Sequence, residues 1–218
     1  MSKSIIKQMI EEGKFTKEDV MEFAKLGYSQ IENGMLIKFD ERDLDKNGNY
    51  TVPEGVNVID GYAFSDVKAN IINLGNVTHI RENAFWNNNI QHIVLPNTLK
   101  FVEKWAFHLS WEITSIKLPN SLEEIPANAF DNCLKLKTVK LPKNLKVIGK
   151  CAFARCEELT NIVLPNSVEK IEDGAFSRCV SLKSLNRPKN LRWLGQKVFF
   201  ESPMSSIRFT SIKSEYVK

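Results

Sequence analysis

The sequence predicts a β-rich α/β architecture, in which a solenoid of about seven stacked rungs follows a helical hairpin. The solenoid is predicted by a repeat: five of the eight prolines lie 23 residues apart, at Pro96, Pro119, Pro142, Pro165 and Pro188. Each of them is followed ten and eleven residues later by Ala-Phe or, once, by Val-Phe. A fixed period of this length is the signature of a repeat architecture. The hairpin is predicted by a different, helical period at the start of the chain.

Residues 1–40 are expected to form the helical cap. Ser4 can cap a first helix whose apolar face is Ile5, Ile6, Met9 and Ile10. Thr16 and Asp19 resemble a capping signal before a second helix, with an apolar stripe at Val20, Phe23, Ala24 and Leu26 and with Gly27 at its end. The hairpin has two interpretations. It can shield the exposed end of the solenoid, as terminal repeats require, or it can dock a partner or a second copy of the chain.

The segment after the cap matches a calcium-loop pattern. Asp43, Asp45, Asn47 and Glu54 offer oxygen ligands at loop positions 1, 3, 5 and 12, with Gly48 at position 6. An EF-hand needs a helix on both sides, whereas Tyr50 to Pro53 belong to the first repeat strand. The favoured interpretation is a polar turn in which Asn47 and Gly48 reverse the chain. Calcium binding stays open as the alternative.

Residues 41–210 are expected to form the solenoid, and residues 133–155 illustrate one rung, CLKLKTVKLPKNLKVIGKCAFAR. Val139 and Leu141 point inward from a short strand, and Lys140 points outward. Pro142 ends this strand because it has no N–H, and a second extended segment follows at Leu145 to Ile148. The same frame recurs in residues 156–178, so the apolar columns define the core: Cys133, Leu136, Val139, Leu141, Leu145, Ile148, Ala152 and Phe153 in the first copy.

A single rung cannot bury its apolar face, whereas stacked rungs pair their strands in parallel at about 4.8 Å and share one core. The aromatic marker of each rung counts seven rungs, at Phe64, Phe85, Phe107, Phe130, Phe153, Phe176 and Phe199. The first two intervals are shortened to 21 and 22 residues. Residues 211–218 are expected to form a C-terminal tail.

The spaced phrase LPxxLxxIxxxAFxxCxxLxxVxLP resembles the BspA-like (Treponema-type) leucine-rich repeat family. It holds in register over four consecutive repeats, and the first rung, NGNYTVPEGVNVIDGYAF, is similar. The resemblance implies a right-handed leucine-rich repeat solenoid with a parallel β-sheet on one face and short strands and loops on the other. It also implies a protein-binding role, often as a bacterial surface or secreted adhesin, and no catalytic residues or cofactors.

Composition agrees with a folded chain: 43% of the residues are hydrophobic and 26% are charged. No stretch reaches the roughly 18 apolar residues of a membrane span, and the first 40 residues lack the features of a secretory signal. We therefore expect a cytoplasmic location, or a secreted or surface location if a signal has been removed. A monomer is expected, with dimerisation through the hairpin as the alternative.

Cysteine and histidine positions do not point to metal, redox or catalytic chemistry. Cys133, Cys156 and Cys179 share one column, which Ser110 and Ser202 fill in other rungs, so a small buried residue is expected there. Cys151 lies in another column, and no CxxC spacing occurs. The three histidines, His79, His92 and His108, fall in three different columns and are expected on the solvated surface. They cannot readily converge on one nucleophile, so we expect no enzyme.

Binding residues are expected where side chains point out of the array. The outer ladder of the sheet face is Asn73, Val94, Lys117, Lys140, Val163, Asn186 and Arg208, and the flanking ladder is Ile71, His92, Ser115, Thr138, Asn161, Ser184 and Ser206. His92, Val94, Lys117, Lys140 and Val163 combine apolar contact with charge, as protein-binding surfaces do. The alternative is that β-branched residues simply suit strands.

A second candidate surface is a set of aromatic residues outside the core columns: Trp86, Phe101, Trp105, His108 and Trp111. Aromatic residues are enriched in binding hot spots. The alternative is that the irregular rungs use these side chains to fill gaps or to contact the hairpin.

Positive charge is concentrated towards the C-terminus. Residues 132–156 hold seven cations and no acid: Lys135, Lys137, Lys140, Lys143, Lys146, Lys150 and Arg155. Residues 183–218 hold eight basic and two acidic residues, while the whole chain has a net charge of +4. Clustered lysines attract nucleic acid or another polyanion. Because these lysines encircle one rung instead of lining one face, a solvated surface is the favoured interpretation, and the preferred partner is a protein of unknown identity.

Overall fold

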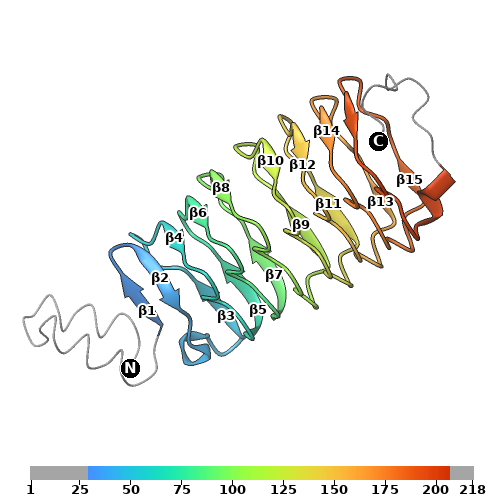
Figure 1. The fold of residues 1–218 in the computed structure, drawn as a ribbon. Coiled ribbons are helices and arrows are strands. Elements are labelled where there is room, and N and C mark those ends of the chain that lie inside the picture. The colour runs from blue at the N-terminus through green and yellow to red at the C-terminus, as the bar shows by residue number, and fades with distance from the viewer. Residues whose placement is uncertain (1–28, 207–218) are drawn as a thin grey trace, which may run out of the picture.

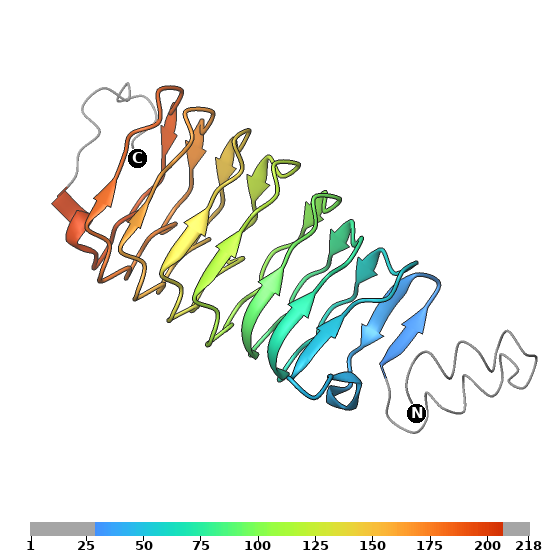
Figure 2. The ribbon, with the colours of Figure 1, turned by 180° about the vertical axis from the view of Figure 1, so that it is seen from behind.

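The chain forms an elongated stack of β-rungs in the computed structural model, which describes residues 29–206 (Figure 1). Each rung passes through a strand on one side of the stack, turns, and returns through a shorter strand on the other side. The view from behind shows the same order of strands along the whole stack (Figure 2). The expected helices of residues 4–27 and the tail 211–218 lie outside the described residues. The predicted solenoid is confirmed.

From β2 onward, successive strands alternate between two walls, and all neighbouring pairs in the described residues except β1 with β2 are parallel. The long-strand wall contains β3 (Asn49–Thr51), β5 (Lys68–Asn73), β7 (Asn89–Val94), β9 (Ser115–Lys117), β11 (Thr138–Lys140), β13 (Asn161–Ile162) and β15 (Ser184–Leu185). The short-strand wall contains β2 (Met35–Lys38), β4 (Val58–Ile59), β6 (His79–Ile80), β8 (Phe101–Val102), β10 (Glu124–Ile125), β12 (Val147–Ile148), β14 (Lys170–Ile171) and β16 (Trp193–Leu194). The described residues also contain the 3-10 helices η1 (Glu41–Asp43) and η2 (Pro203–Ser206). Rungs are numbered 1 to 7, from the one with β3 and Phe64 to the one with β15 and Phe199.

Residues 29–40 belong to the solenoid and not to a helical cap, so the predicted boundary at residue 40 is wrong. β1 (Gln30–Glu32) pairs antiparallel with β2, which in turn pairs parallel with β4. The hairpin turn is Asn33-Gly34, whose φ angles of 48° and 76° suit the two-residue turn that joins twisted strands. Leu36 is fully buried and extends the core beyond rung 1.

A stack of phenylalanine rings runs through the centre of the array. The marker residues from Phe64 to Phe176 are buried, and successive ring centroids lie 4.8, 5.1, 5.0, 5.4 and 5.5 Å apart with nearly parallel planes. Phe39 adds a ring before Phe64, at 4.9 Å. The apolar column residues predicted for the copy at residues 133–155 are buried, except Val139 and Leu141, which are only partly buried. The core is therefore continuous from rung to rung.

A third wall, which the sequence did not predict, surrounds the marker phenylalanines. In this turn wall the residues two positions before and two positions after each phenylalanine have a left-handed backbone, with φ of 63° at Trp105 and 59° at Leu109. Successive rungs are hydrogen-bonded here as well: the Phe107 N–H donates to the Ala129 carbonyl at 2.9 Å, and the Phe130 N–H donates to that of Ala152 at 2.8 Å. The turn wall therefore ties successive rungs together on a third side, in addition to the two strand walls where these are continuous.

Both strand walls are interrupted between rungs 3 and 4, because β8 does not pair with β10 and β7 does not pair with β9 in the described sheets. Pro126 explains the gap between β8 and β10, because proline has no N–H to donate. At the same place in the neighbouring rungs, the Glu103 N–H donates to the Ile80 carbonyl at 2.9 Å and the Gly149 N–H donates to the Ile125 carbonyl at 2.8 Å. The second gap follows an inserted residue. Phe85 and Pro96 are 11 positions apart, whereas Phe107 and Pro119 are 12 apart, so the six-residue β7 is succeeded by a turn and the three-residue β9.

Candidate protein-binding surface

The two outward ladders predicted for the long-strand wall are in register within each sheet of that wall, whereas Ser206, predicted for the flanking ladder, lies in η2. In the outer ladder, Asn73 lies beside Val94 and Lys117 beside Lys140. In the flanking ladder, the neighbours are Ile71 and His92, Ser115 and Thr138, and Asn161 and Ser184. Arg208 lies outside the described residues. His92, Val94, Lys117, Lys140 and Val163 are all exposed on this wall, and we call the two ladders together the ladder surface.

The ladder surface combines exposed aliphatic groups with uncompensated positive charge. Val94 is 48% exposed and Val163 is 74% exposed. No described position of either ladder carries a carboxylate. Lys117 and Lys140 are direct neighbours across β9 and β11, an arrangement of like charges that is destabilising unless an anion lies nearby. The surface therefore favours contact with an acidic, partly apolar partner.

The ring of cations around rung 5 is partly neutralised by neighbouring rungs. Three salt bridges join Lys135 to Glu112 at 2.8 Å, Lys137 to Glu158 at 3.2 Å and Lys146 to Glu123 at 2.7 Å. Lys140 and Lys143 form no salt bridge with any described residue. The cations of rung 5 that have no salt bridge with a described residue therefore include Lys140, which lies on the ladder surface.

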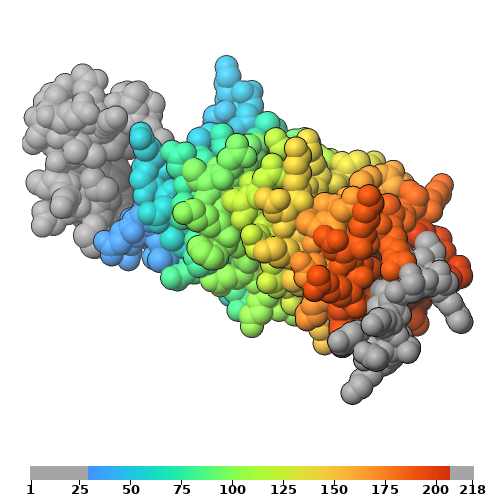
Figure 3. Space-filling view, turned by 90° about the horizontal axis from the view of Figure 1, so that it is seen from above, coloured from blue at the N-terminus to red at the C-terminus, as the bar shows by residue number. Residues whose placement is uncertain are grey.

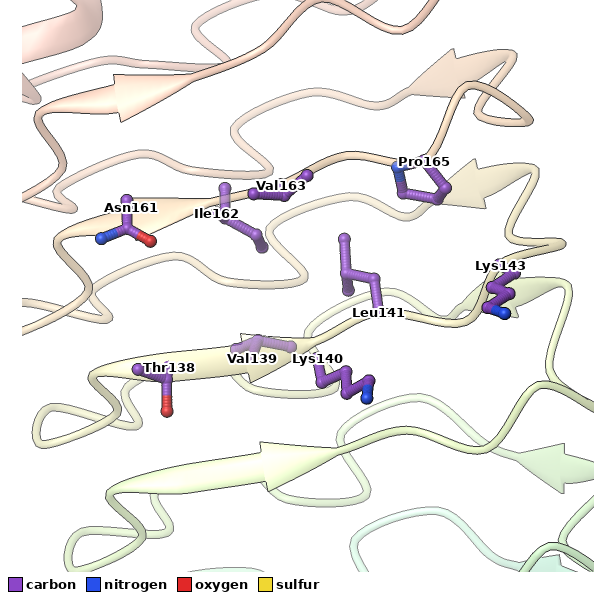
Figure 4. Close-up of a pocket in the computed structure, with 9 residues that line it drawn as sticks. All are labelled: Thr138, Val139, Lys140, Leu141, Lys143, Asn161, Ile162, Val163 and Pro165. Atoms are coloured by element: carbon purple, nitrogen blue, oxygen red, sulfur yellow. The ribbon is translucent and has the colours of Figure 1, made fainter.

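A groove of about 360 Å³ opens on the ladder surface between rungs 5 and 6 (Figure 4). Leu141 and Ile162 point into the space between β11 and β13, while Lys140 lies on the far side of β11 from β13 and Lys143 follows in the turn (Figure 4). The two strands belong to separate sheets in the described structure, and nothing in their side chains explains the interruption. The groove thus places apolar side chains next to cations.

The five aromatic residues predicted as a second surface occupy several different environments. Phe101 is 60% exposed on β8 of the short-strand wall, and its ring centroid lies 5.6 Å from that of His79. Trp86 is half-buried in the turn wall, 6.2 Å from Tyr62. Among the described residues, no ring contact joins either of them to Trp105. Phe101 is the exposed aromatic of the set.

Trp105 and His108 pack together in the turn wall, with ring centroids 4.8 Å apart in an edge-to-face arrangement. His108 differs from the expected solvated histidine, because its side chain is only 15% exposed and its Nδ1 lies 3.0 Å from the Asp131 carbonyl oxygen. Since this oxygen only accepts hydrogen bonds, Nδ1 must carry the proton. Burial lowers the pKa of His108 and raises the pKa of the Asp131 carboxyl, although these groups lie within ion-pair distance. The pair bridges rungs 3 and 4, where both strand walls are interrupted.

The buried His108 is expected to make the protein less stable as the pH falls below the ordinary histidine value of 6.5. In this window the unfolded chain binds a proton that the folded His108 resists, so stability decreases with decreasing pH. Asp131 opposes this trend towards lower pH, because its raised pKa lets the folded state take up a proton first. We expect His108→Asn to flatten the dependence of the urea midpoint on pH between pH 7 and about 5.5. Equal slopes in both proteins would contradict the assignment.

Trp111 is a structural residue at the junction of rungs 3 and 4. Its Nε1–H donates to Asn87 Oδ1 at 2.9 Å, and its backbone N–H donates to the Asn88 carbonyl at 3.0 Å. It lies in the turn created by the inserted residue before β9. Trp111 therefore fits the alternative interpretation of the aromatic set, in which these side chains fill gaps in the irregular rungs.

The predicted cysteine column is confirmed as a buried column of small residues. Cys133, Cys156 and Cys179 are buried free thiols, with Ser110 and Ser202 buried at the equivalent places. Each thiol donates to the phenylalanine carbonyl of the preceding rung, at 3.2, 3.3 and 3.0 Å respectively. Burial raises the pKa of all three thiols, to about 12 for Cys179, so they stay protonated. The column serves packing.

Two carboxylates of the calcium-like loop, those of Asp43 and Asp45, accept backbone hydrogen bonds. Asp45 Oδ1 accepts hydrogen bonds from the N–H groups of Asn47 and Asn49 at 2.8 and 2.9 Å, which lower the pKa of Asp45. Asp43 lies in η1 and accepts from the Ser29 N–H at 3.0 Å, and Glu54 is exposed beyond β3. Gly48 has a φ of 74°, as a chain reversal requires. This geometry is that of the polar turn.

The remaining histidines do not assemble a catalytic group in the described structure. His79 Nε2 lies 2.7 Å from Glu103 Oε1 on the short-strand wall, whereas His92 is on the ladder surface. No three His, Cys, Asp or Glu side chains among residues 29–206 are grouped to hold a metal ion.

None of the described helices has the length and apolar character to cross a membrane. The cytoplasmic location stays a prediction.

A sequence comparison identifies a family model that matches most of the chain. The model, described as a BspA type leucine rich repeat region, matches residues 43–160 and 146–217 in six copies. No functionally curated protein matches the chain.

Solved structures with the same fold come from several bacteria. A leucine-rich repeat protein from Eubacterium ventriosum is 18% identical with a TM-score of 0.73, and the alignment covers 83% of this chain and 49% of that chain. One from Bacteroides ovatus is 24% identical with a TM-score of 0.56, covering 87% and 55%. The T. pallidum leucine-rich repeat protein is 25% identical with a TM-score of 0.57, covering 82% and 76%. The chain thus spans about half the length of the first two proteins.

Proposed function

Because the chain belongs to the family of BspA-type leucine-rich repeat proteins, we propose that it is a non-enzymatic scaffold that binds a protein partner through the ladder surface. One observation carries the proposal: the ladder surface exposes valines and lysines and has no carboxylate at any described ladder position. Uncompensated charge beside exposed apolar groups is the composition of a recognition surface.

A protein partner suits this surface better than a nucleic acid. The salt bridges of Lys135, Lys137 and Lys146 remove charge that a polyanion would need. Val94 and Val163 offer contact area that a phosphate backbone cannot use. The partner is accordingly a protein with an acidic and partly apolar face.

Affinity capture tests the proposal. The full chain is immobilised and incubated with an extract of its native host, beside a variant that combines Val94→Asp, Lys117→Glu and Lys140→Glu. We expect a protein to be retained by the original chain and lost from the variant, because both the apolar contact and the charge complementarity are reversed.

The matched control places the same three kinds of change away from the ladders, at the exposed residues Val180, Lys100 and Lys150. Val180→Asp with Lys100→Glu and Lys150→Glu should retain the protein. Equal retention by both variants would exclude the ladder surface as the binding site. Retention of nucleic acid that is released in high salt would instead support the polyanion alternative.

A further inference from the structure

The strand edge that faces the groove lacks a hydrogen bond made elsewhere on the long-strand wall. A leucine at the end of the long strand can donate its N–H to the next rung. The Leu74 N–H donates to the Val94 carbonyl oxygen at 3.1 Å, and the Leu118 N–H donates to the Lys140 carbonyl oxygen at 3.0 Å. In rung 6 the Leu164 N–H donates to Asn186 Oδ1 at 2.7 Å. Leu141 holds the same place in rung 5 and makes no such bond with the described residues. A backbone donor is therefore left at the groove.

The interruption also uncovers part of the core. In rung 4 the inward residues Ile116 and Leu118 are each only 4% exposed, whereas the equivalent residues of rung 5, Val139 and Leu141, are half-buried and line the groove. Val163, on its other side, has the largest exposed fraction of the exposed large hydrophobic residues. An apolar side chain that filled the groove would remove this surface from water.

The cations at the groove define the charge of its occupant. Lys140 and Lys143 line the groove, and Lys117 lies beside Lys140 on the next strand. The other polar lining residues, Thr138 and Asn161, are neutral. Carboxylates on the occupant would relieve the repulsion between Lys117 and Lys140.

We propose that this groove binds an extended acidic peptide segment of the partner, running along β11 and β13. An apolar side chain of the segment contacts Leu141 and Val163, its carboxylates lie beside Lys140 and Lys143, and a carbonyl or carboxylate oxygen accepts the Leu141 N–H. An extended chain fits because its successive side chains point to opposite faces, so apolar side chains can face Leu141 while carboxylates face Lys140. This inference rests on the proposed function and names the part of the partner that rung 5 recognises.

Nuclear magnetic resonance of the full ¹⁵N-labelled chain tests the proposal with an acetylated, amidated peptide of sequence Glu-Leu-Glu-Leu-Glu. The expected result is a set of saturable amide shifts centred on Leu141, Lys140 and Val163. Two other peptides, Gln-Leu-Gln-Leu-Gln and Glu-Ser-Glu-Ser-Glu, should each bind at least about threefold more weakly, because one lacks the charge and the other lacks the apolar contact.

Variants of the chain should agree with the peptide series. Lys140→Gln combined with Lys143→Gln should raise the Kd for Glu-Leu-Glu-Leu-Glu by about fivefold, and Val163→Thr by about threefold. Lys150→Gln, at an exposed cation outside the groove, should leave the Kd unchanged. The thermal midpoint of each variant is measured beside the Kd, so that a loss of binding is not confused with a loss of fold.

Three results would overturn the inference: shifts centred elsewhere, equal binding of the Gln peptide, or equally strong shifts with a single-stranded oligonucleotide of the same charge. If the peptide does not bind but the ladder variant still loses the captured protein, the groove assignment is wrong and the proposed function stands. If the peptide binds as expected but the ladder variant keeps the captured protein, the groove assignment stands and the ladder surface is not the site of that partner.

Discussion

Phe153→Ala is expected to lower the free energy of unfolding by about 3–5 kcal/mol, as the removal of a large aromatic side chain from a core does. The Phe153 ring is fully buried, and its centroid lies 5.4 Å from that of Phe130 and 5.5 Å from that of Phe176. The neighbouring rungs cannot easily close the resulting cavity, because the short-strand and turn walls hold them at a fixed spacing. Urea unfolding followed by circular dichroism measures the effect.

Phe101→Ala is the matched control, since it removes the same side chain from a position that is 60% exposed on the short-strand wall. It should change the free energy of unfolding by no more than about 0.5 kcal/mol. Amide hydrogen exchange should locate the damage of Phe153→Ala in rungs 4 to 6, which share its ring contacts. A loss for Phe153→Ala no greater than that for Phe101→Ala would refute the role of the ring stack.

The core could be predicted from the sequence because every rung repeats it. Phe153, Cys156 and Leu159 are buried in the columns that their counterparts occupy in neighbouring rungs, and a column repeated in register outweighs the ambiguity of any single residue. The same register predicted which residues point outward, so the ladder surface followed from the frame.

The turn wall could not be predicted because its left-handed positions show no common residue type. The position two before the marker phenylalanine is Tyr62, Asn83, Trp105, Asn128, Cys151, Gly174 and Lys197. Left-handed backbone favours glycine and asparagine, yet tyrosine, tryptophan, cysteine and lysine adopt it here. The hydrogen bonds between rungs impose this conformation, and residue preferences do not reveal it.

The dispersion of the predicted aromatic set over several environments has the same origin. Trp105 and His108 lie outside the core columns, but the turn wall half-buries them against each other and against Asp131. A repeat pattern that includes only the two strand walls predicts that both side chains are exposed to solvent. The hairpin of residues 30–38 did have a signal, Asn33-Gly34 between apolar residues, which is typical of a two-residue turn. The groove had none, since it depends on hydrogen bonds that are missing between β11 and β13.

Gly149→Ala is expected to cost about 2–3 kcal/mol of unfolding free energy, because the added methyl group would overpack the contact between rungs 4 and 5. A Cβ atom at Gly149 would lie 2.7 Å from Ala127 N, 2.8 Å from Ile125 O and 2.8 Å from the carbonyl carbon of Pro126. All three are backbone atoms, so relief requires the rungs to separate. The backbone of Gly149 is not left-handed, so crowding alone causes the loss.

Gly55→Ala separates crowding from backbone strain. Gly55 has a φ of 90°, and a Cβ atom there would meet nothing within 4 Å, so only the conformational penalty of about 1 kcal/mol applies. We expect the urea midpoint to fall more for Gly149→Ala than for Gly55→Ala. Gly149→Ala should also speed the exchange of the amide at position 149. In the original chain this N–H donates to the Ile125 carbonyl oxygen across the crowded contact. If Gly149→Ala proved as stable as the original chain, or lost less stability than Gly55→Ala, the close approach of rungs 4 and 5 at Gly149 would not be a constraint on the fold.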